Sequence, residues 1–336
     1  MGRISCSGVS VSLTSGLSLP SPLSQQSHDE LTDISIGSDQ TIRVWSTRER
    51  LELARLTHHS PIVNAYWLEG DAGVIVLTDD GLVSKWTKIG PNAWKWAKVL
   101  NAGDDLRSDQ DPICFAYAKD RIAVSFPRLG VKVWIFSNGV WHVQRSILRQ
   151  NVTAITFMEN GEALLGGTRD GALWYCEIPN GTLRAYAFLK SKIISLDLSP
   201  TGTHVLVGSS SGGAALVALR KSENKGHIEK VYSLNKEGDG WAGRNEFGAT
   251  FATKGQAVLF ASVDSCALVW DRKKGGAVYG LEHDEGDIIE AVATVDSIAG
   301  REGCMVSGTR SGQLCWWALP VAAGQGQGKS SGCFRS

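Results

Sequence analysis

Residues 51–86, LELARLTHHSPIVNAYWLEGDAGVIVLTDDGLVSKW, contain four short β-like stretches separated by turns. Residues 51–57 alternate apolar and polar side chains, which is typical of a half-buried strand. Residues 62–68 form a second stretch, and residues 74–78 are a continuous apolar run, as expected for a strand covered on both faces. A turn at Asp79-Asp80-Gly81 precedes the last stretch, which ends at Trp86. We therefore expect short antiparallel strands joined by tight turns.

The same pattern recurs along the chain at a nearly constant spacing. Seven β-like runs end at the same register, at Trp45, Trp86, Trp134, Cys176, Ala218, Trp270 and Trp317. Successive end positions are 41, 48, 42, 42, 52 and 47 residues apart. A period in the forties with strand-like units is typical of a β-propeller, whose blades bury their faces against one another. The sequence therefore predicts an all-β fold, a seven-bladed β-propeller of four-stranded antiparallel blades.

The composition argues against several classes of protein. The 336 residues have a formal net charge of zero, which disfavours nucleic acid as a partner. No apolar run approaches the roughly 18 residues that a membrane span needs, and residues 1–6 lack the apolar stretch of a signal peptide. The seven cysteines include no C-x-x-C pair, and the histidines are scattered. We expect an intracellular protein of the cytoplasm, the nucleus or both, with free thiols, no metal, no cofactor and no membrane partner.

Two further positions are shared by most repeats. A hydroxyl residue lies eight positions before the end position at Thr78, Thr168, Ser210, Ser262 and Thr309, and an aspartate lies six positions before it at Asp39, Asp80, Asp170 and Asp264. With these residues, the segment 31–319 resembles the WD-repeat (WD40) family of β-propellers. In this family a turn aspartate, a strand hydroxyl, the strand tryptophan and a histidine form a hydrogen-bonded set. The resemblance assigns this structural role to His59, Thr78, Asp80 and Trp86.

Several repeats depart from the family pattern. Cys176 and Ala218 replace the tryptophan in blades four and five. In blade three, Phe126 and Arg128 replace the hydroxyl residue and the aspartate. Only residues 270–271 give the Trp-Asp dipeptide. The resemblance therefore implies a divergent member and identifies no subfamily.

The chain divides into three segments. We expect residues 1–30 to hold a strand and a loop rich in Ser, Pro and Gln, residues 31–319 the propeller, and residues 320–336 a disordered Gly/Gln/Ser-rich tail. WD40 propellers usually close by placing an N-terminal strand on the outer edge of the last blade. Residues 4–13 fit this latch or the inner strand of blade one. The sequence thus offers one candidate strand for two positions and does not decide how the ring closes. It also does not decide whether the chain is cut from a longer protein.

In this architecture, the loops between blades and the aspartate-bearing turns surround one mouth of the central channel. Two of these loops are acidic and carry Asp104, Asp105, Asp284 and Asp287, whereas Arg149 and Lys190–Lys192 make other loops basic. We predict partner binding at the four aspartates and at Trp241, an aromatic residue in the longest insertion. The alternative is that these charged loops are ordinary solvated surface.

Basic residues gather at the opposite mouth, among them Arg272 and Lys273 after the Trp-Asp dipeptide. A basic rim fits an acidic peptide, a phosphorylated segment or a phosphate backbone. Residues 259–273 also resemble the box with which some WD40 proteins dock on the adaptor of cullin-4 ubiquitin ligases. That resemblance implies that Arg272 or Lys273 contacts the adaptor.

The sequence contains no catalytic motif of the G-x-S-x-G, Walker or H-E-x-x-H type. We therefore predict a non-catalytic scaffold, a monomeric propeller that binds other proteins or peptides within a larger complex. One alternative is a substrate receptor of a cullin-4-type ubiquitin ligase that docks through blade six. A less favoured alternative is an enzyme whose active site is assembled at the channel mouth from residues distant in sequence.

Overall fold

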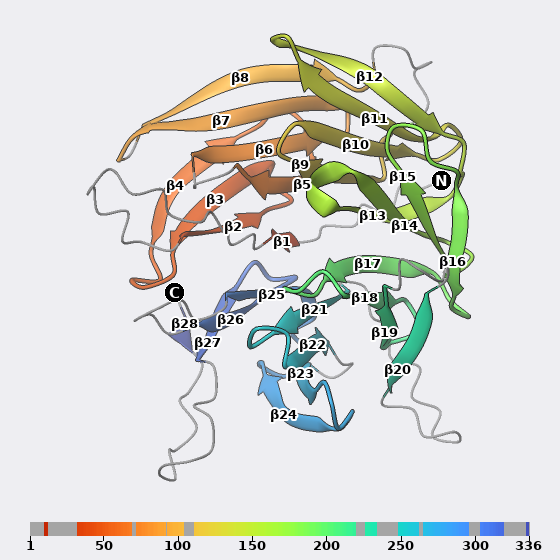
Figure 1. Cartoon of the computed structure of the whole chain (residues 1–336). Coiled ribbons are helices and arrows are strands. Elements are labelled where there is room, and N and C mark those ends of the chain that lie inside the picture. The colour runs from red at the N-terminus through yellow and green to blue at the C-terminus, as the bar shows by residue number, and fades with distance from the viewer. Residues whose placement is uncertain are drawn as a thin grey trace, which may run out of the picture.

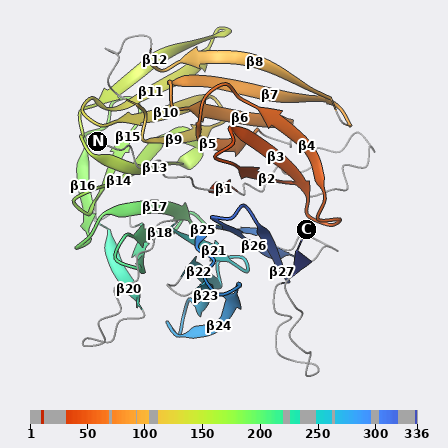
Figure 2. The ribbon, with the colours of Figure 1, turned by 180° about the vertical axis from the view of Figure 1, so that it is seen from behind.

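The computed structural model describes residues 10–12, 32–68, 72–91, 93–103, 111–219, 226–233, 248–261, 265–295, 303–318 and 334–335. These residues form seven antiparallel sheets of four strands each, arranged in chain order around a ring (Figure 1). The view from behind shows the same succession of sheets (Figure 2). The predicted all-β, seven-bladed propeller is therefore confirmed.

Blades one to four follow one another along the chain. Blade one contains β1 (Ser10–Ser12), β2 (Thr32–Ile36), β3 (Thr41–Ser46) and β4 (Glu52–Thr57). Blade two contains β5 (Ile62–Trp67), β6 (Gly73–Thr78), β7 (Leu82–Gly90) and β8 (Ala93–Asn101). Blade three contains β9 (Cys114–Ala118), β10 (Arg121–Phe126), β11 (Gly130–Ser137) and β12 (Val140–Ile147). Blade four contains β13 (Val152–Met158), the short 3-10 helix η2 (Glu159–Gly161), β14 (Ala163–Thr168), β15 (Ala172–Glu177) and β16 (Arg184–Phe188).

Blades five to seven complete the ring. Blade five contains β17 (Ile193–Leu198), β18 (His204–Ser209), β19 (Gly213–Ala218) and β20 (His227–Ser233). Blade six contains β21 (Ala249–Ala252), β22 (Ala257–Ala261), β23 (Cys266–Asp271) and β24 (Ala277–Glu282). Blade seven contains β25 (Ile289–Val295), β26 (Cys304–Thr309), β27 (Leu314–Ala318) and β28 (Phe334–Arg335).

The first strand of each blade is its inner strand, because the first strands of neighbouring blades contact one another, as β13 does with β17 and β21 with β25. Burial is greatest at the second strand of a blade and falls toward the outer edge. All six residues of β6 are buried, as its continuous apolar sequence predicts, whereas β4 at the outer edge alternates between exposed and more buried side chains. At the outer edge of blade three, Asn138 and Gly139 turn β11 into β12 with φ angles of 52° and 82°. An Asn-Gly pair is favoured in such two-residue turns.

Apolar side chains fill the space between successive blades. Trp134 lies between blades two and three, with Phe115 and Ile122. Trp270 lies between blades five and six, with Tyr232 and Phe260. The aromatic side chains at the other tryptophan registers, Trp45, Trp86 and Trp317, also pack against the preceding blade. The core is therefore divided among the interfaces between blades, as stacked propeller blades require.

The ring closes without a blade that combines N-terminal and C-terminal strands among the described residues. Ser10–Ser12 pairs with β2 and is the inner strand of blade one, and it contacts β25 of blade seven. Residues 10–12, the described part of the predicted strand 4–13, are therefore the inner strand of blade one and not the latch on the last blade. Within the predicted tail, Phe334 and Arg335 pair with Trp316 and Cys315 as the outer strand of blade seven, and the rest of residues 320–336 lies outside the described residues. The remainder of residues 1–31 lies outside the described residues.

No helix among the described residues is long and apolar enough to cross a membrane.

Candidate functional site

Backbone hydrogen bonds divide the loops of the propeller into two faces. The loops between blades bond to the turns between second and third strands: the amide of Asp79 donates to Pro61 O at 2.9 Å, and that of Leu189 to Gly171 O at 2.8 Å. We call this side the connection face. The turns between first and second strands bond to those between third and fourth strands, as Arg272 N does to Gln256 O at 3.0 Å. These turns form the opposite face.

In blade two, the predicted hydrogen-bonded set is divided between two histidines. His59 Nε2 lies 3.0 Å from Asp80 Oδ2, and the hydroxyl of Thr78 donates to Asp80 Oδ1 at 2.6 Å. The indole N–H of Trp86 donates instead to Nε2 of His58 at 3.0 Å. The structure thus brings His59, Thr78 and Asp80 together, whereas Trp86 is bonded to the histidine before His59.

The two histidines lie in different environments. His58 is buried, and this burial lowers its pKa to about 4, with a smaller contribution from the neighbouring His59. His59 is exposed beside Asp80. Partial burial acts to raise the Asp80 pKa, but hydrogen bonds from Thr78, the Leu82 amide and His59 outweigh it and hold the pKa below its usual value. Asp80 is therefore an ionised, fully engaged carboxylate of the turn.

Two blades place the partner of the tryptophan at a position that the sequence pattern did not single out. Trp45 donates to the hydroxyl of Ser35 at 2.9 Å, and Trp317 to that of Ser307 at 2.8 Å. In both blades the serine lies ten positions before the tryptophan, rather than eight. His283 completes the set in blade seven, with Nε2 2.7 Å from the Ser307 hydroxyl. The repeated serine at this spacing is the signal that would have identified these two blades.

Blade four compensates for its missing tryptophan. Cys176 is buried at the register position, and Trp174, two residues earlier on β15, fills the same interface with only 2% of its surface exposed. The ring of Trp174 lies over Gly166 on the paired strand, where an added Cβ would be 2.0 Å from Cζ2. A glycine inside a buried strand marks such a close approach.

Charges divide the connection face into two sectors. The acidic sector comprises the loops of blades six, seven, one and two, with Asp284, Glu285, Asp287, Asp39, Asp79, Asp80 and Asp111. Arg310, which pairs with Glu290, is its one Lys or Arg among the described residues. The basic sector comprises the loops of blades three, four and five, with Arg128, Arg149, Arg169, Lys190 and Lys192, and with Asp170 as its one carboxylate among the described residues. Burial and the nearby charges of Asp80 and Asp111 raise the pKa of Asp79. The described loops thus give this face two regions of opposite sign.

The structure describes two of the five residues predicted to bind partners on the connection face. Asp284 and Asp287 lie in the loop between β24 and β25, where the Asp287 amide donates to Asp284 O at 3.0 Å. Asp104, Asp105 and Trp241 lie outside the described residues. The predicted binding roles of all five remain predictions.

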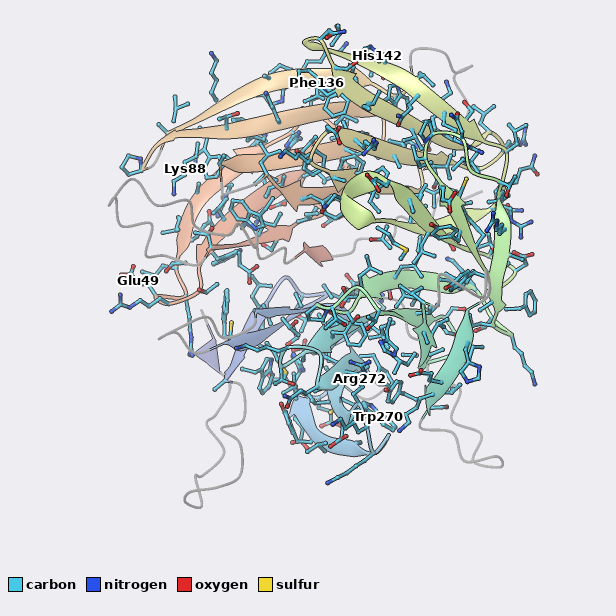
Figure 3. The ribbon with its side chains drawn as sticks, viewed as in Figure 1. Glu49, Lys88, Phe136, His142, Trp270 and Arg272 are labelled. Atoms are coloured by element: carbon cyan, nitrogen blue, oxygen red, sulfur yellow. The ribbon has the colours of Figure 1, made fainter. Side chains whose placement is uncertain are left out.

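On the opposite face, Arg272 and Lys273 differ in how they are held. The Arg272 guanidinium donates to Gly255 O at 3.2 Å and lies 5.6 Å from the centre of the Phe251 ring. Lys273 is exposed, and its amide donates to the Asp271 carboxylate at 2.8 Å. Figure 3 labels Arg272 beside Trp270 on blade six. Arg272 thus contributes to the packing of blade six, while the Lys273 side chain extends from its surface.

The described residues contain no group of three or more His, Cys, Asp or Glu side chains arranged to hold a metal ion.

The ring, its two faces and its interblade tryptophans define a seven-bladed β-propeller. No protein-family model matches the chain. Transducin beta-like protein 3 of Mus musculus is 23% identical over 303 residues, which cover 86% of this chain and 36% of that protein. The protein of the same name from Rattus norvegicus shows the same identity and coverage. The chain thus spans little more than a third of the length of these curated relatives.

A crystal structure of the Cps50 (Swd1) β-propeller domain of Myceliophteria thermophila matches the fold with a TM-score of 0.68. Its sequence identity is 15%, and the match covers 86% of this chain and 94% of that domain. The chain has the fold of a seven-bladed β-propeller, and its sequence is similar to that of the transducin beta-like proteins named above.

Proposed function

We propose that this chain is a non-catalytic WD40 scaffold that binds other proteins through its connection face. The division of that face into an acidic and a basic sector supports the proposal most directly. Complementary charge selects partners and speeds their association, and a rigid ring of blades loses little conformational entropy when it binds. The acidic sector includes Asp284 and Asp287, and we propose the same binding role for Asp104, Asp105 and Trp241.

The cellular setting follows from the same proposal. Cys114, Cys176 and Cys304 are free thiols, which fits a reducing compartment. We infer a monomeric propeller in the cytoplasm or nucleus that joins a larger complex through protein partners. A net charge of zero disfavours nucleic acid as a general ligand.

Affinity capture with quantitative mass spectrometry tests the scaffold function. One variant changes Asp104, Asp105, Asp284 and Asp287 to Asn. A matched control neutralises four carboxylates on the opposite face, through Glu49→Gln, Asp120→Asn, Glu162→Gln and Glu177→Gln. We expect the first variant to lose partners that the wild type and the control retain. Equal recovery by all three proteins would reject the acidic sector as a binding surface, and turnover on a broad hydrolase panel would reject the non-catalytic assignment.

A second candidate function is substrate receptor of a cullin-4-type ligase that docks through blade six. Exposed lysines at positions 273 and 274 on the opposite face favour it. The informative variant is Lys273→Glu with Lys274→Glu, because Arg272 also holds Gly255 and Phe251 and its loss would disturb the blade. Capture of the ligase adaptor by the wild type and its loss in this variant would support docking. Unchanged capture would end this idea.

A further inference from the structure

Three exposed apolar side chains come from adjacent segments of the connection face at blade three. Leu148, in the loop after β12, is 86% exposed, and Leu129 and Ile113 are each 36% exposed. The Leu129 turn lies directly against the Leu148 loop, because Asn151 N donates to Pro127 O at 3.3 Å. Ile113 is tied to the same blade by a bond from its amide to Ser125 O at 2.9 Å. We call Ile113, Leu129 and Leu148 the apolar patch.

This patch replaces a carboxylate found at the corresponding turn of other blades. In blades two and four, Thr78 and Thr168 donate to Asp80 and Asp170, so that each turn presents a carboxylate. In blade three, Phe126 is fully buried at the threonine position. Arg128 then occupies the aspartate position, followed by Leu129. The turn of blade three therefore carries an arginine and a leucine where its neighbours carry an aspartate.

Blade five has lost its turn carboxylate as well. Its turn carries Ser209 and Ser211, whose hydroxyls are 2.8 Å apart, and Ser191 of the preceding loop is 3.1 Å from Ser211. These hydroxyls carry no charge that would neutralise the flanking Lys190 and Lys192, which are exposed.

Most of the positive charge of the basic sector is available to a ligand. Arg149 is paired with Asp170 at 3.1 Å. The side chains of Arg169, Lys190 and Lys192 form no ion pair among the described residues. Single surface charges attract only weakly in water, so that binding needs several of them together with an apolar anchor.

We propose that the apolar patch and the basic sector together bind a short acidic segment of a partner protein. An aliphatic or aromatic side chain of that segment lies on Leu129 and Leu148, and its anionic groups face Arg169, Lys190 and Lys192. The anionic groups are carboxylates or phosphates, which share the chemistry that basic side chains recognise. This inference rests on the proposed scaffold function, and it assigns the partner chemistry of one sector.

The acidic sector of the same face favours a peptide over a larger polyanion. Its seven carboxylates would repel a nucleic acid or an anionic lipid surface spread across the face. A short segment confined to blades three to five avoids that repulsion.

A displayed library of random 12-residue peptides, selected on the full chain, tests the proposal. Selected peptides are synthesised and their Kd is measured by fluorescence anisotropy at low and high salt. We expect enrichment of Asp and Glu together with at least one Leu, Ile or Phe, and weaker binding at high salt. Replacing one Glu by phosphoserine then shows which anionic group the sector prefers.

Two variants assign the binding surface. Leu148→Asp alters the apolar patch, and a triple variant, Arg169→Glu, Lys190→Glu and Lys192→Glu, reverses the basic sector. Each has a matched control elsewhere: Val278→Asp on β24, which is 61% exposed, and the triple Lys88→Glu, Lys95→Glu and Lys119→Glu at exposed lysines of blades two and three. We expect Kd to rise about tenfold or more in both test variants and less than about twofold in the controls. Circular dichroism and thermal unfolding confirm that each variant is folded.

The outcomes separate this inference from the scaffold function. Peptides without acidic enrichment, or peptides that bind both test variants as the wild type does, overturn the inference and leave the scaffold function standing. If vesicles containing phosphatidylserine bind the wild type but neither test variant, while no peptide is selected, the ligand is a lipid surface and the inference is wrong. If the wild type selects no peptide and captures no protein, both proposals fail.

Discussion

The indole N–H of Trp86 donates a 3.0 Å hydrogen bond to Nε2 of His58. An indole nitrogen can only donate, so Nε2 is the acceptor and the proton of the neutral imidazole lies on Nδ1. The bond joins the loop before blade two to its third strand. Because the next residue, His59, bonds Asp80 at the surface, two adjacent histidines connect the same loop to two different groups of blade two.

Replacing the two histidines separately should give unequal losses of stability. His58→Ala removes the buried acceptor and leaves the Trp86 N–H unpaired, which we expect to lower the free energy of unfolding by about 1–3 kcal/mol. His59→Ala removes an exposed contact and should cost about 0.5 kcal/mol or less. Urea unfolding followed by tryptophan fluorescence measures both. An equal or larger loss in His59→Ala would contradict the division of roles.

The buried His58 also predicts a loss of stability in mild acid. Its pKa of about 4 in the folded protein lies below the ordinary value of 6.5, so the unfolded chain binds the proton more readily between these pH values. The free energy of unfolding should therefore fall as pH decreases from about 6.5 toward 4, by roughly 1–2 kcal/mol from this residue. Urea unfolding at several pH values between 7 and 5 measures the slope.

Two substitutions isolate the contribution of His58 to this slope. His58→Gln keeps an acceptor for Trp86 without a titrating ring, so its stability should fall less steeply with acid. His227→Gln, at an exposed position on β20, should retain the slope of the wild type. Identical slopes in all three proteins would show that His58 does not titrate in this way.

The fold could be predicted from sequence because each blade repeats the same local requirements. A buried second strand and a tight turn recur every 41 to 52 residues, and five of the seven blades carry a tryptophan at the same register, which packs between blades. The division of charge on the connection face was also visible, because loop residues such as Arg149 and Asp284 keep their faces once the blades are placed.

Other features depend on contacts that no local pattern encodes. Which of His58 and His59 reaches Trp86 depends on the path of one loop, and both choices satisfy the same sequence motif. Phe334 and Arg335 pair with β27 through their backbone. A strand of two residues is too short to show a side-chain pattern that would predict this pairing. The 86% exposure of Leu148 is likewise not indicated by its residue type, which is usually found in a core.

Because Trp174 packs directly on Gly166, we expect that a methyl group added at position 166 destabilises the protein. An added Cβ at Gly166 meets the indole ring, so Gly166→Ala should lower the free energy of unfolding by about 1–3 kcal/mol. Gly276→Ala is the matched control, because no atom lies within 4 Å of the added Cβ there. Chemical denaturation compares the two.

A double-mutant cycle identifies the cause of that loss. Trp174→Phe makes room, so that adding Gly166→Ala to it should cost less than adding it to the wild type. The prediction fails if Gly166→Ala is as stable as the wild type, or if its cost is unchanged by Trp174→Phe.

The last prediction concerns a buried carboxylate where the ring closes. Asp33 on β2 is 1% exposed, and neither of its carboxylate oxygens accepts a hydrogen bond of normal geometry from a described residue. Burial raises the Asp33 pKa well above its ordinary value, although the Ile34 amide acts in the other direction. Burial, with a contribution from the Asp33 charge, likewise raises the pKa of Cys304 in blade seven to about 12. The two side chains therefore bring poorly solvated acidic groups to the contact between the first and last blades.

Asp33→Asn should consequently stabilise the protein at neutral and alkaline pH. Because the folded pKa of Asp33 is raised, its effect is absent at pH values below the unfolded pKa near 3.9 and grows as pH rises through the folded value. We expect the free energy of unfolding at pH 8 to increase by about 1–3 kcal/mol, with a smaller gain at pH 5. Glu49→Gln, at an exposed carboxylate of blade one (Figure 3), should change it by less than about 0.5 kcal/mol. A loss of stability in Asp33→Asn at pH 8 would mean that the ionised carboxylate is needed to close the ring.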